Sequence, residues 1–207
     1  MTQRMQDLIG EILRLQSELE AEIDQRREAL GWRLRERFVE FEEGIAAEHR
    51  RLKTSAARFL AESSIASILT APVIYSLIVP LVALDLWANL YQQICFRAYG
   101  IPRVRRADYV VFDRARLAYL NWIEALNCRY CSYANGVVAF VREIASRTEQ
   151  YWCPIKHALK ATDPHRRYVG FLDYGDADGY RTRLEELRTL LREETARAEA
   201  ETAAPKA

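Results

Sequence analysis

The feature that most constrains this chain is a long apolar segment in its first half. No charged side chain occurs from Ser63 to Leu84, and Asp85 is the only charged residue before Phe96. A helix over residues 63–84 would be about 33 Å long, enough for a hydrocarbon core of about 30 Å. The segment therefore predicts a membrane-inserted element. The alternative is a buried central helix of a soluble bundle.

Positive charge on both sides of this segment restricts how it can enter a membrane. Basic residues precede it at positions 50, 51, 53 and 58 and follow it at positions 97, 103, 105 and 106. Positively charged flanks favour the cytoplasmic side, so both flanks are predicted to be cytoplasmic. A helical hairpin with its turn near Pro80 meets this requirement, because residues 63–79 and 80–96 are each about 25 Å long as helices. A single membrane-spanning helix is the alternative.

The basic residues after the apolar segment are also candidate lipid ligands. Gly100 and Pro102 are expected to end the preceding element, so three of the arginines lie on a connector and Arg97 lies just before it. Arginine near an anionic membrane surface contributes about 1 kcal/mol to binding. The four predicted headgroup ligands are Arg97, Arg103, Arg105 and Arg106. A solvated loop is the other interpretation.

The composition favours an all-α fold. The charged segments are rich in Ala, Glu, Leu and Arg, and the chain has only eight Gly and six Pro. Residues 3–60 predict a long amphipathic helix with weak points at Gly31 and Gly44. Its apolar stripe is predicted to pack on another helix, in a partner protein or in a second copy. The stripe consists of Leu8, Ile12, Leu15, Leu19 and Ile23, continued by Leu30, Leu34, Phe38, Phe41 and Ile45.

The second half of the chain predicts a further helical domain. Helical spacings run over residues 108–131 and 137–152, and Asn135-Gly136 between them is a turn signal. A short connection would make the two helices antiparallel neighbours. Pro154 ends the second helix, and a new helix is expected at residues 155–160. The last amphipathic helix is followed by a tail, residues 193–207, that is predicted to be disordered.

Three cysteines and a histidine in this domain have metal-site spacing. They form a C-x2-C … C-x3-H set consisting of Cys128, Cys131, Cys153 and His157. In an antiparallel helix pair the two ligand pairs would face each other, and four ligands would close a structural zinc site. Such a site could add roughly 10 kcal/mol to folding. The alternative is that these cysteines are small buried apolar residues.

Two carboxylates near the same residues suggest a different metal. Glu124 precedes Cys128 by one helical turn, and Glu149 precedes Cys153 by the same interval. Both are candidate metal ligands, or supports of metal ligands, in a helical iron site. A redox-active dithiol formed by Cys128 and Cys131 is a further interpretation, although no βαβ pattern surrounds it.

These features together predict four regions and a non-enzymatic function. The regions are a coiled-coil-like part (1–62), a membrane-inserted helix or hairpin (63–96), a helical domain with the metal site (97–192) and the tail (193–207). We expect a membrane-associated scaffold or interaction protein stabilised by zinc. A membrane-bound iron or dithiol redox enzyme and a soluble helical adaptor are the alternatives. The 30 basic and 29 acidic residues give no argument for a nucleic-acid partner.

Overall fold

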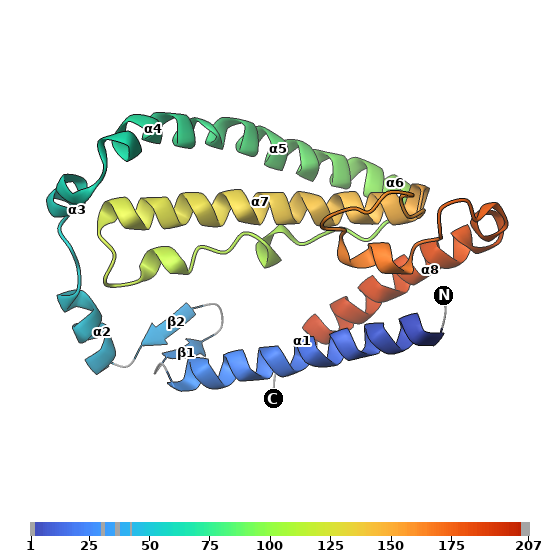
Figure 1. Cartoon of the computed structure of the whole chain (residues 1–207), viewed down its shortest axis with the longest axis horizontal. Coiled ribbons are helices and arrows are strands. Elements are labelled where there is room, and N and C mark those ends of the chain that lie inside the picture. Colours follow the sequence, from blue (N-terminus) through green and yellow to red (C-terminus); the bar gives the residue numbers. More distant parts are fainter. Residues whose placement is uncertain (1–2, 30–31, 36–37, 42, 204–207) are drawn as a thin grey trace. The chain divides into compact units, whose positions relative to one another are not determined.

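The computed structural model describes residues 3–29, 32–35, 38–41 and 43–203, and these are mostly helical (Figure 1). The chain divides into two compact units. The first contains residues 1–63 and 113–127, and the second contains residues 64–112 and 128–207. The division falls within one long helix, so each unit combines segments that are distant in the sequence.

The first unit contains a helix, a β-hairpin and two shorter helices. Helix α1 (Gln3–Ala29) is followed by strands β1 (Trp32–Arg35) and β2 (Phe38–Phe41), which pair antiparallel with Trp32 opposite Phe41. Helices α2 (Glu43–Arg51) and α3 (Ala56–Glu62) come next. A short 3₁₀ turn, η3 (Arg114–Arg116), also belongs to this unit.

The prediction of one helix over residues 3–60 was therefore wrong after residue 29. Trp32-Arg33-Leu34-Arg35 alternates apolar and polar residues, and aromatic and β-branched residues follow at 38–41. This composition favours strands over helix. Leu30 and Gly31 lie outside the described residues, as do the side chains of Leu34, Phe38, Phe41 and Ile45. Gly44 is the second residue of α2, so the helical structure starts again directly beside it.

The apolar segment forms one continuous helical element of 35 residues, Ile65–Tyr99, in the second unit. It consists of α4 (Ile65–Ser76), α5 (Ile78–Tyr91), the π-helical turn η1 (Gln92–Phe96) and α6 (Arg97–Tyr99). The Ser64 hydroxyl caps its start by accepting a hydrogen bond from the Ser67 N–H at 3.1 Å. Gly100 ends it with a left-handed backbone (φ 66°), which glycine adopts without strain.

The predicted hairpin with a turn near Pro80 is therefore not formed. Pro80 lies in the first turn of α5, where a missing N–H is tolerated. The proline only perturbs the helix at Leu77, which separates α4 from α5 but keeps a right-handed helical backbone. Pro72 lies inside α4 without ending it. Both prolines are thus accommodated in a single helix.

Helix α7 (Trp122–Trp152) is a second long helix and runs through the predicted turn at Asn135-Gly136. Asn121 and Glu124 form its N-terminal capping box. The Asn121 side chain accepts hydrogen bonds from the Ile123 and Glu124 N–H groups, and the Glu124 carboxylate accepts one from the Asn121 N–H. The predicted pair of antiparallel helices was therefore wrong.

Gly136, which the sequence suggested as part of a turn, instead allows close packing inside α7. A Cβ atom at this position would lie 2.7 Å from the Tyr109 carbonyl oxygen and 2.9 Å from the Val110 Cα. Glycine is therefore required because the 109–110 backbone, just after the 3₁₀ turn η2 (Arg106–Asp108), crosses α7 at close range.

The chain after α7 forms a loop and a last helix. Ile155 and Leu172 make an isolated parallel bridge, where residues 155–160 were predicted to be helical. A 3₁₀ turn, η4 (Arg166–Gly170), lies between them, and α8 (Ala177–Ala203) follows. The predicted disordered tail from residue 193 is helical up to Ala203, because it is rich in the good helix formers Ala, Glu and Arg. Residues 204–207 lie outside the described residues.

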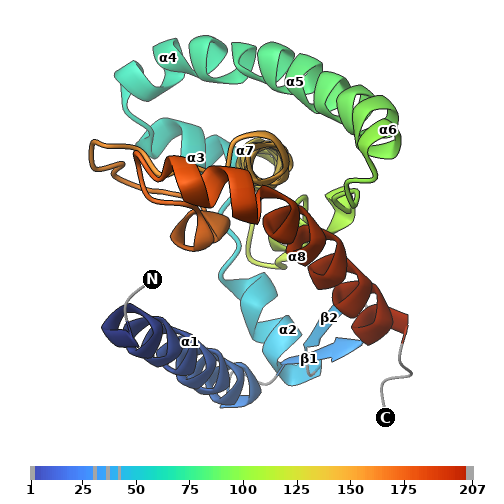
Figure 2. The same ribbon diagram turned by 90° about the vertical axis from the view of Figure 1, so that its right-hand side faces the viewer.

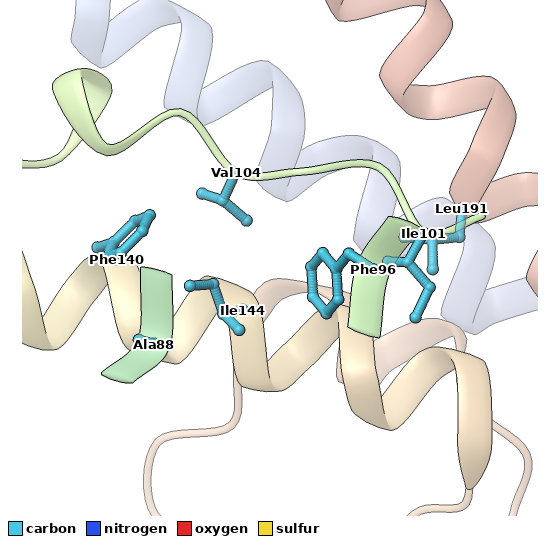
Figure 3. Packing of buried hydrophobic residues seen from close by; sticks show 7 residues of the cluster. All are labelled: Ala88, Phe96, Ile101, Val104, Phe140, Ile144 and Leu191. Carbon is cyan, nitrogen blue, oxygen red and sulfur yellow. The ribbon is translucent and has the colours of Figure 1, made fainter. Parts of the chain in front are cut away.

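The core of the second unit joins the apolar helix to α7, α8 and the connector after Gly100 (Figure 3). Phe96 and Phe140 are fully buried, and Leu191 from α8 is 1 % exposed. The labelled cluster consists of Ala88, Phe96, Ile101, Val104, Phe140, Ile144 and Leu191. It gathers at the C-terminal part of the apolar helix, which fixes that part against α7.

Candidate functional site

One side of the apolar helix is exposed and almost entirely hydrophobic. Within the most apolar 18-residue window of Ile65–Tyr99, only 6 % of the residues are buried. We call the exposed side the outer face. Its most prominent side chains are each at least two-thirds exposed, namely Ile65, Leu69, Val73, Val79, Leu86 and Trp87, and Leu90 and Ile94 extend it toward the end of the helix.

The hydroxyl groups on the exposed part of α4 form hydrogen bonds within the helix. Thr70 Oγ1 donates to the Ala66 carbonyl at 2.8 Å, and Ser76 Oγ donates to the Val73 carbonyl at 2.7 Å. Each hydroxyl thus has a backbone partner in its own helix. Such self-satisfied hydroxyls can contact hydrocarbon at low cost.

The opposite side, which we call the inner face, carries polar groups that are buried against the same unit. Asp85 is 6 % exposed. Its carboxylate accepts hydrogen bonds from two nitrogens of Arg106, at 2.9 and 2.7 Å, and from Tyr133 Oη at 3.0 Å. Asn89 Nδ2 donates a further hydrogen bond to Asp85 at 2.9 Å. The single charge of the apolar segment is therefore paired inside the protein.

Gln92 extends the polar seam of the inner face toward the connector. This side chain is 2 % exposed. Its Oε1 accepts a hydrogen bond from the Val104 N–H at 2.9 Å, and its Nε2 donates to the Val104 carbonyl at 3.4 Å. The Gln92 side-chain amide thereby bonds both backbone groups of Val104, and its hydrogen-bonding groups face the protein.

Helix α7 lies alongside the inner face and runs parallel to the apolar helix (Figures 1 and 2). Tyr130 Oη donates to the Ile74 carbonyl at 2.7 Å near one end. Tyr91 Oη and Thr148 Oγ1 are 3.1 Å apart near the other end. The contact between Tyr133 and Asp85 lies between them. Polar contacts thus join the two helices from the C-terminal end of α4 to the end of α5.

This arrangement is the reverse of a typical soluble helix. In water an amphipathic helix buries its apolar side and exposes its charged side. Here the polar side chains Asp85, Asn89 and Gln92 face the protein, and the aliphatic side chains face outward. A contiguous exposed apolar surface of this kind marks a site for a membrane or for another protein.

The four predicted headgroup arginines have different environments. Arg97, Arg103 and Arg105 are exposed, and Arg103 donates a hydrogen bond to Gln93 Oε1 at 2.8 Å. Arg105 lies 3.8 Å from Asp108. Arg106 is engaged by Asp85 in the inner face. Arg97 and Arg103 therefore present the most accessible positive charge near the end of the apolar helix.

The predicted zinc ligands are not brought together. Cys128 and Cys131 lie on α7, and Cys153 directly follows its last residue. Because α7 is one continuous helix, the two pairs are separated by about 37 Å at about 1.5 Å per residue. No group of three or more His, Cys, Asp and Glu side chains in the described part of the chain could hold a metal ion.

Each of these residues has its own environment instead. Burial, assisted by the negative charge of Glu149, raises the pKa of the Cys153 thiol, which makes its thiolate less available. The His157 ring stacks on Tyr168 with centroids 6.0 Å apart. Cys131 is exposed, and Cys128 is half-buried. The redox-active dithiol of Cys128 and Cys131 stays a prediction, with both residues on α7 and both thiols free.

The two predicted carboxylate ligands have structural partners. Glu124 belongs to the capping box of α7. Glu149 lies 2.8 Å from His165 Nε2, which ties α7 to the chain next to η4. The distance along α7 between the two carboxylates also argues against one iron site.

Sequence reasoning missed the hydrogen-bonded cluster of Asp85, Arg106 and Tyr133. The signal was present, because one carboxylate inside a long uncharged segment requires a buried partner or an exit to water. Arg106, predicted from the sequence as a lipid ligand, is also the cationic partner that Asp85 requires.

Comparison with known protein families, with curated proteins and with solved structures found no match for this chain. The function is therefore argued from the surface and its chemistry.

Proposed function

We propose that this protein is a membrane-associated helical scaffold that attaches to lipid through the outer face of the apolar helix. The observation that carries the proposal is the inverted polarity of that helix, with aliphatic side chains outward and Asp85 paired inward. Water-exposed aliphatic side chains of this number are unfavourable, and each would gain about 1.5–3 kcal/mol on full transfer to hydrocarbon. A membrane surface provides that environment.

The basic flanks support the same attachment. Arg97 and Arg103 are exposed near the C-terminal end of the apolar helix. Each would add about 1 kcal/mol at an anionic surface. Both flanks of the helix are proposed to lie on the cytoplasmic side, where anionic lipid is available.

The alternatives are less well supported by the described residues. A soluble adaptor would bury the apolar segment within its own core, but the segment is exposed in this chain. A zinc-stabilised domain or an iron enzyme would require the Cys/His set to converge, whereas α7 holds its two pairs apart. Elemental analysis of purified protein would return either alternative to consideration if it found stoichiometric metal.

A flotation assay with anionic vesicles tests the proposal. The variant Leu69→Gln, Val79→Gln, Leu86→Gln removes apolar surface from the outer face only. Since these side chains are exposed, the fold should be retained, while the lost transfer energy should weaken partitioning at least about 100-fold. The matched control carries Val138→Gln, Leu159→Gln and Leu190→Gln, which are exposed apolar positions elsewhere in the same unit. The proposal would be contradicted if both variants floated like the wild type or if the wild type did not float.

The scaffold character rests on α1. Its stripe of Leu8, Ile12, Leu15, Leu19 and Ile23 is 40–60 % exposed. The first four recur at intervals of four, three and four residues, the spacing of a coiled-coil seam. We therefore assign α1 to self-association with a second copy. Leu15→Asp should shift the protein to the monomer in sedimentation analysis, whereas Ser17→Asp on an exposed polar position should not.

A further inference from the structure

We infer that the apolar helix lies in the plane of one leaflet and does not cross the bilayer, so that both of its ends remain on the same side. This inference rests on the proposed membrane attachment and specifies its geometry. It follows from what packs on the inner face, from the length of the outer face and from the positions of the charges.

The helix cannot turn across a bilayer without taking α7 with it. Contacts from Tyr130 to Ile74 and from Thr148 to Tyr91 fix α7 along the apolar helix. Over this length α7 carries Arg142, Glu143 and Arg147, and Arg142 is exposed. A charged residue at the centre of a membrane helix costs at least about 2.5–3.5 kcal/mol. A crossing orientation would place several of these charges in hydrocarbon.

The connector after Gly100 adds the same constraint. Gln92 holds Val104 through two hydrogen bonds, and Asp85 holds Arg106. The connector also contains Arg103 and Arg105, both exposed. The inner face is thus covered by polar chain at the level of α5 as well as by α7. The exposed arginines on this side of the helix must therefore contact water or lipid headgroups.

The outer face has the dimensions of an in-plane element. From Ile65 to Ile94 it extends about 44 Å at about 1.5 Å per residue, against about 30 Å for the hydrocarbon core. A helix in the plane of the interface has no such upper length and buries its apolar side by about 5–10 Å. The outer face carries no charged residue to oppose this burial, because Asp85 points inward.

An in-plane helix also explains how both flanks can be basic although the segment forms a single helix. One crossing would place the basic residues before and after the helix on opposite sides, against the positive-inside rule. A helix lying in the leaflet places both on one side without a hairpin. The predicted cytoplasmic position of both flanks is then compatible with a single continuous helix.

Labelling of single cysteines tests the geometry. In a chain whose four native cysteines are replaced by alanine, Ala61→Cys reports on the N-terminal side and Ala158→Cys on the C-terminal side. Both positions are exposed. Each chain is expressed in bacteria and treated with a membrane-impermeant maleimide in intact spheroplasts and in inverted membrane vesicles. Both cysteines are expected to react only in inverted vesicles.

Reaction of only one of the two cysteines in intact spheroplasts would overturn the in-plane geometry while leaving membrane attachment intact, and reaction of both would overturn the cytoplasmic position of the flanks. Absence of the chain from the membrane fraction would instead overturn the proposed attachment itself. If the cysteine-free chain does not fold, trypsin treatment of the wild type gives the same information. Cleavage at the exposed Lys53 and Lys160 in inverted vesicles but not in spheroplasts is expected, and cleavage at only one of the two sites in spheroplasts would contradict the in-plane geometry.

Discussion

At the scale of single residues, Asp85 explains how a charge is tolerated in the apolar helix. A buried carboxylate without a partner would be costly, and two nitrogens of Arg106 together with Tyr133 and Asn89 supply its hydrogen bonds. The sequence alone gives the charge but not the partner, since Arg106 and Tyr133 lie 21 and 48 residues away. Such long-range pairing depends on tertiary packing.

Removal of Arg106 should therefore destabilise the second unit. Arg106→Met leaves Asp85 buried without a cationic partner, and we expect a loss of about 3 kcal/mol in the free energy of unfolding, measured with urea. The control is Arg105→Met, because Arg105 is exposed and only 3.8 Å from an exposed Asp108. That change should cost less than about 0.5 kcal/mol. Equal effects of the two variants would show that the ion pair has no special role.

A half-buried carboxylate, Glu143, makes the stability of the fold depend on pH. Burial disfavours the charged form of Glu143 and by itself would raise its pKa. Hydrogen bonds from Arg147 and Arg167, together with their positive charges, outweigh this effect and lower the pKa of Glu143. Because the folded state holds a lower pKa than the unfolded chain, Glu143 stabilises the fold above its unfolded value of about 4.3. That stabilisation is lost as the pH falls through the lowered folded-state pKa.

Glu143→Gln should accordingly flatten the acid side of the stability profile. Urea unfolding measured from pH 7 down to pH 3 should show a steeper loss of stability in the wild type than in the variant. Glu186→Gln, which removes an exposed carboxylate paired with Arg183, should retain the wild-type slope. Parallel profiles for the wild type and Glu143→Gln would refute this assignment.

At the scale of elements, helical periodicity predicted most helices, but glycine and proline signals misplaced the breaks. The continuous helix 65–99 and α7 each contain a residue that sequence rules treat as a turn or a stop, Pro80 and Gly136. Pro80 is tolerated near a helix start, and Gly136 admits the neighbouring backbone. The misplaced break at Gly136 also explains why the predicted zinc ligands are not brought together, because the two ligand pairs could meet only across a turn in α7.

Substitution of Gly136 separates its packing role from its helix propensity. In an open helix, Gly→Ala is stabilising by up to about 1 kcal/mol. At Gly136 the new Cβ would meet the 109–110 backbone at 2.7–2.9 Å, so we expect a loss of about 1–3 kcal/mol in urea unfolding. Gly10→Ala in α1, with no atom within 4 Å of the added Cβ, should raise helicity measured by circular dichroism. Stabilisation by Gly136→Ala would contradict the close approach.

At the scale of the whole molecule, composition and the apolar segment predicted a mostly helical protein with a helix long and apolar enough to span a membrane. Which side of that helix faces outward could not be read from its sequence, because the segment is apolar on nearly all sides and the sorting depends on partners elsewhere in the chain. The structure supplies that distinction through Asp85, Asn89 and Gln92. It is the basis for proposing in-plane attachment.

The most direct test of the account is the depth of single tryptophans in anionic vesicles. Trp32, Trp122 and Trp152 are replaced by phenylalanine. Trp87 is then compared with single tryptophans placed at Leu69 and Val79 on the outer face, each with Trp87 also replaced. Quenching by lipids brominated at different depths locates each indole. The account predicts the same shallow depth for all three, about 5–10 Å below the headgroups. A tryptophan at position 79 close to the bilayer centre, about 15 Å deep, with shallower indoles at 69 and 87, would show a crossing helix and contradict it.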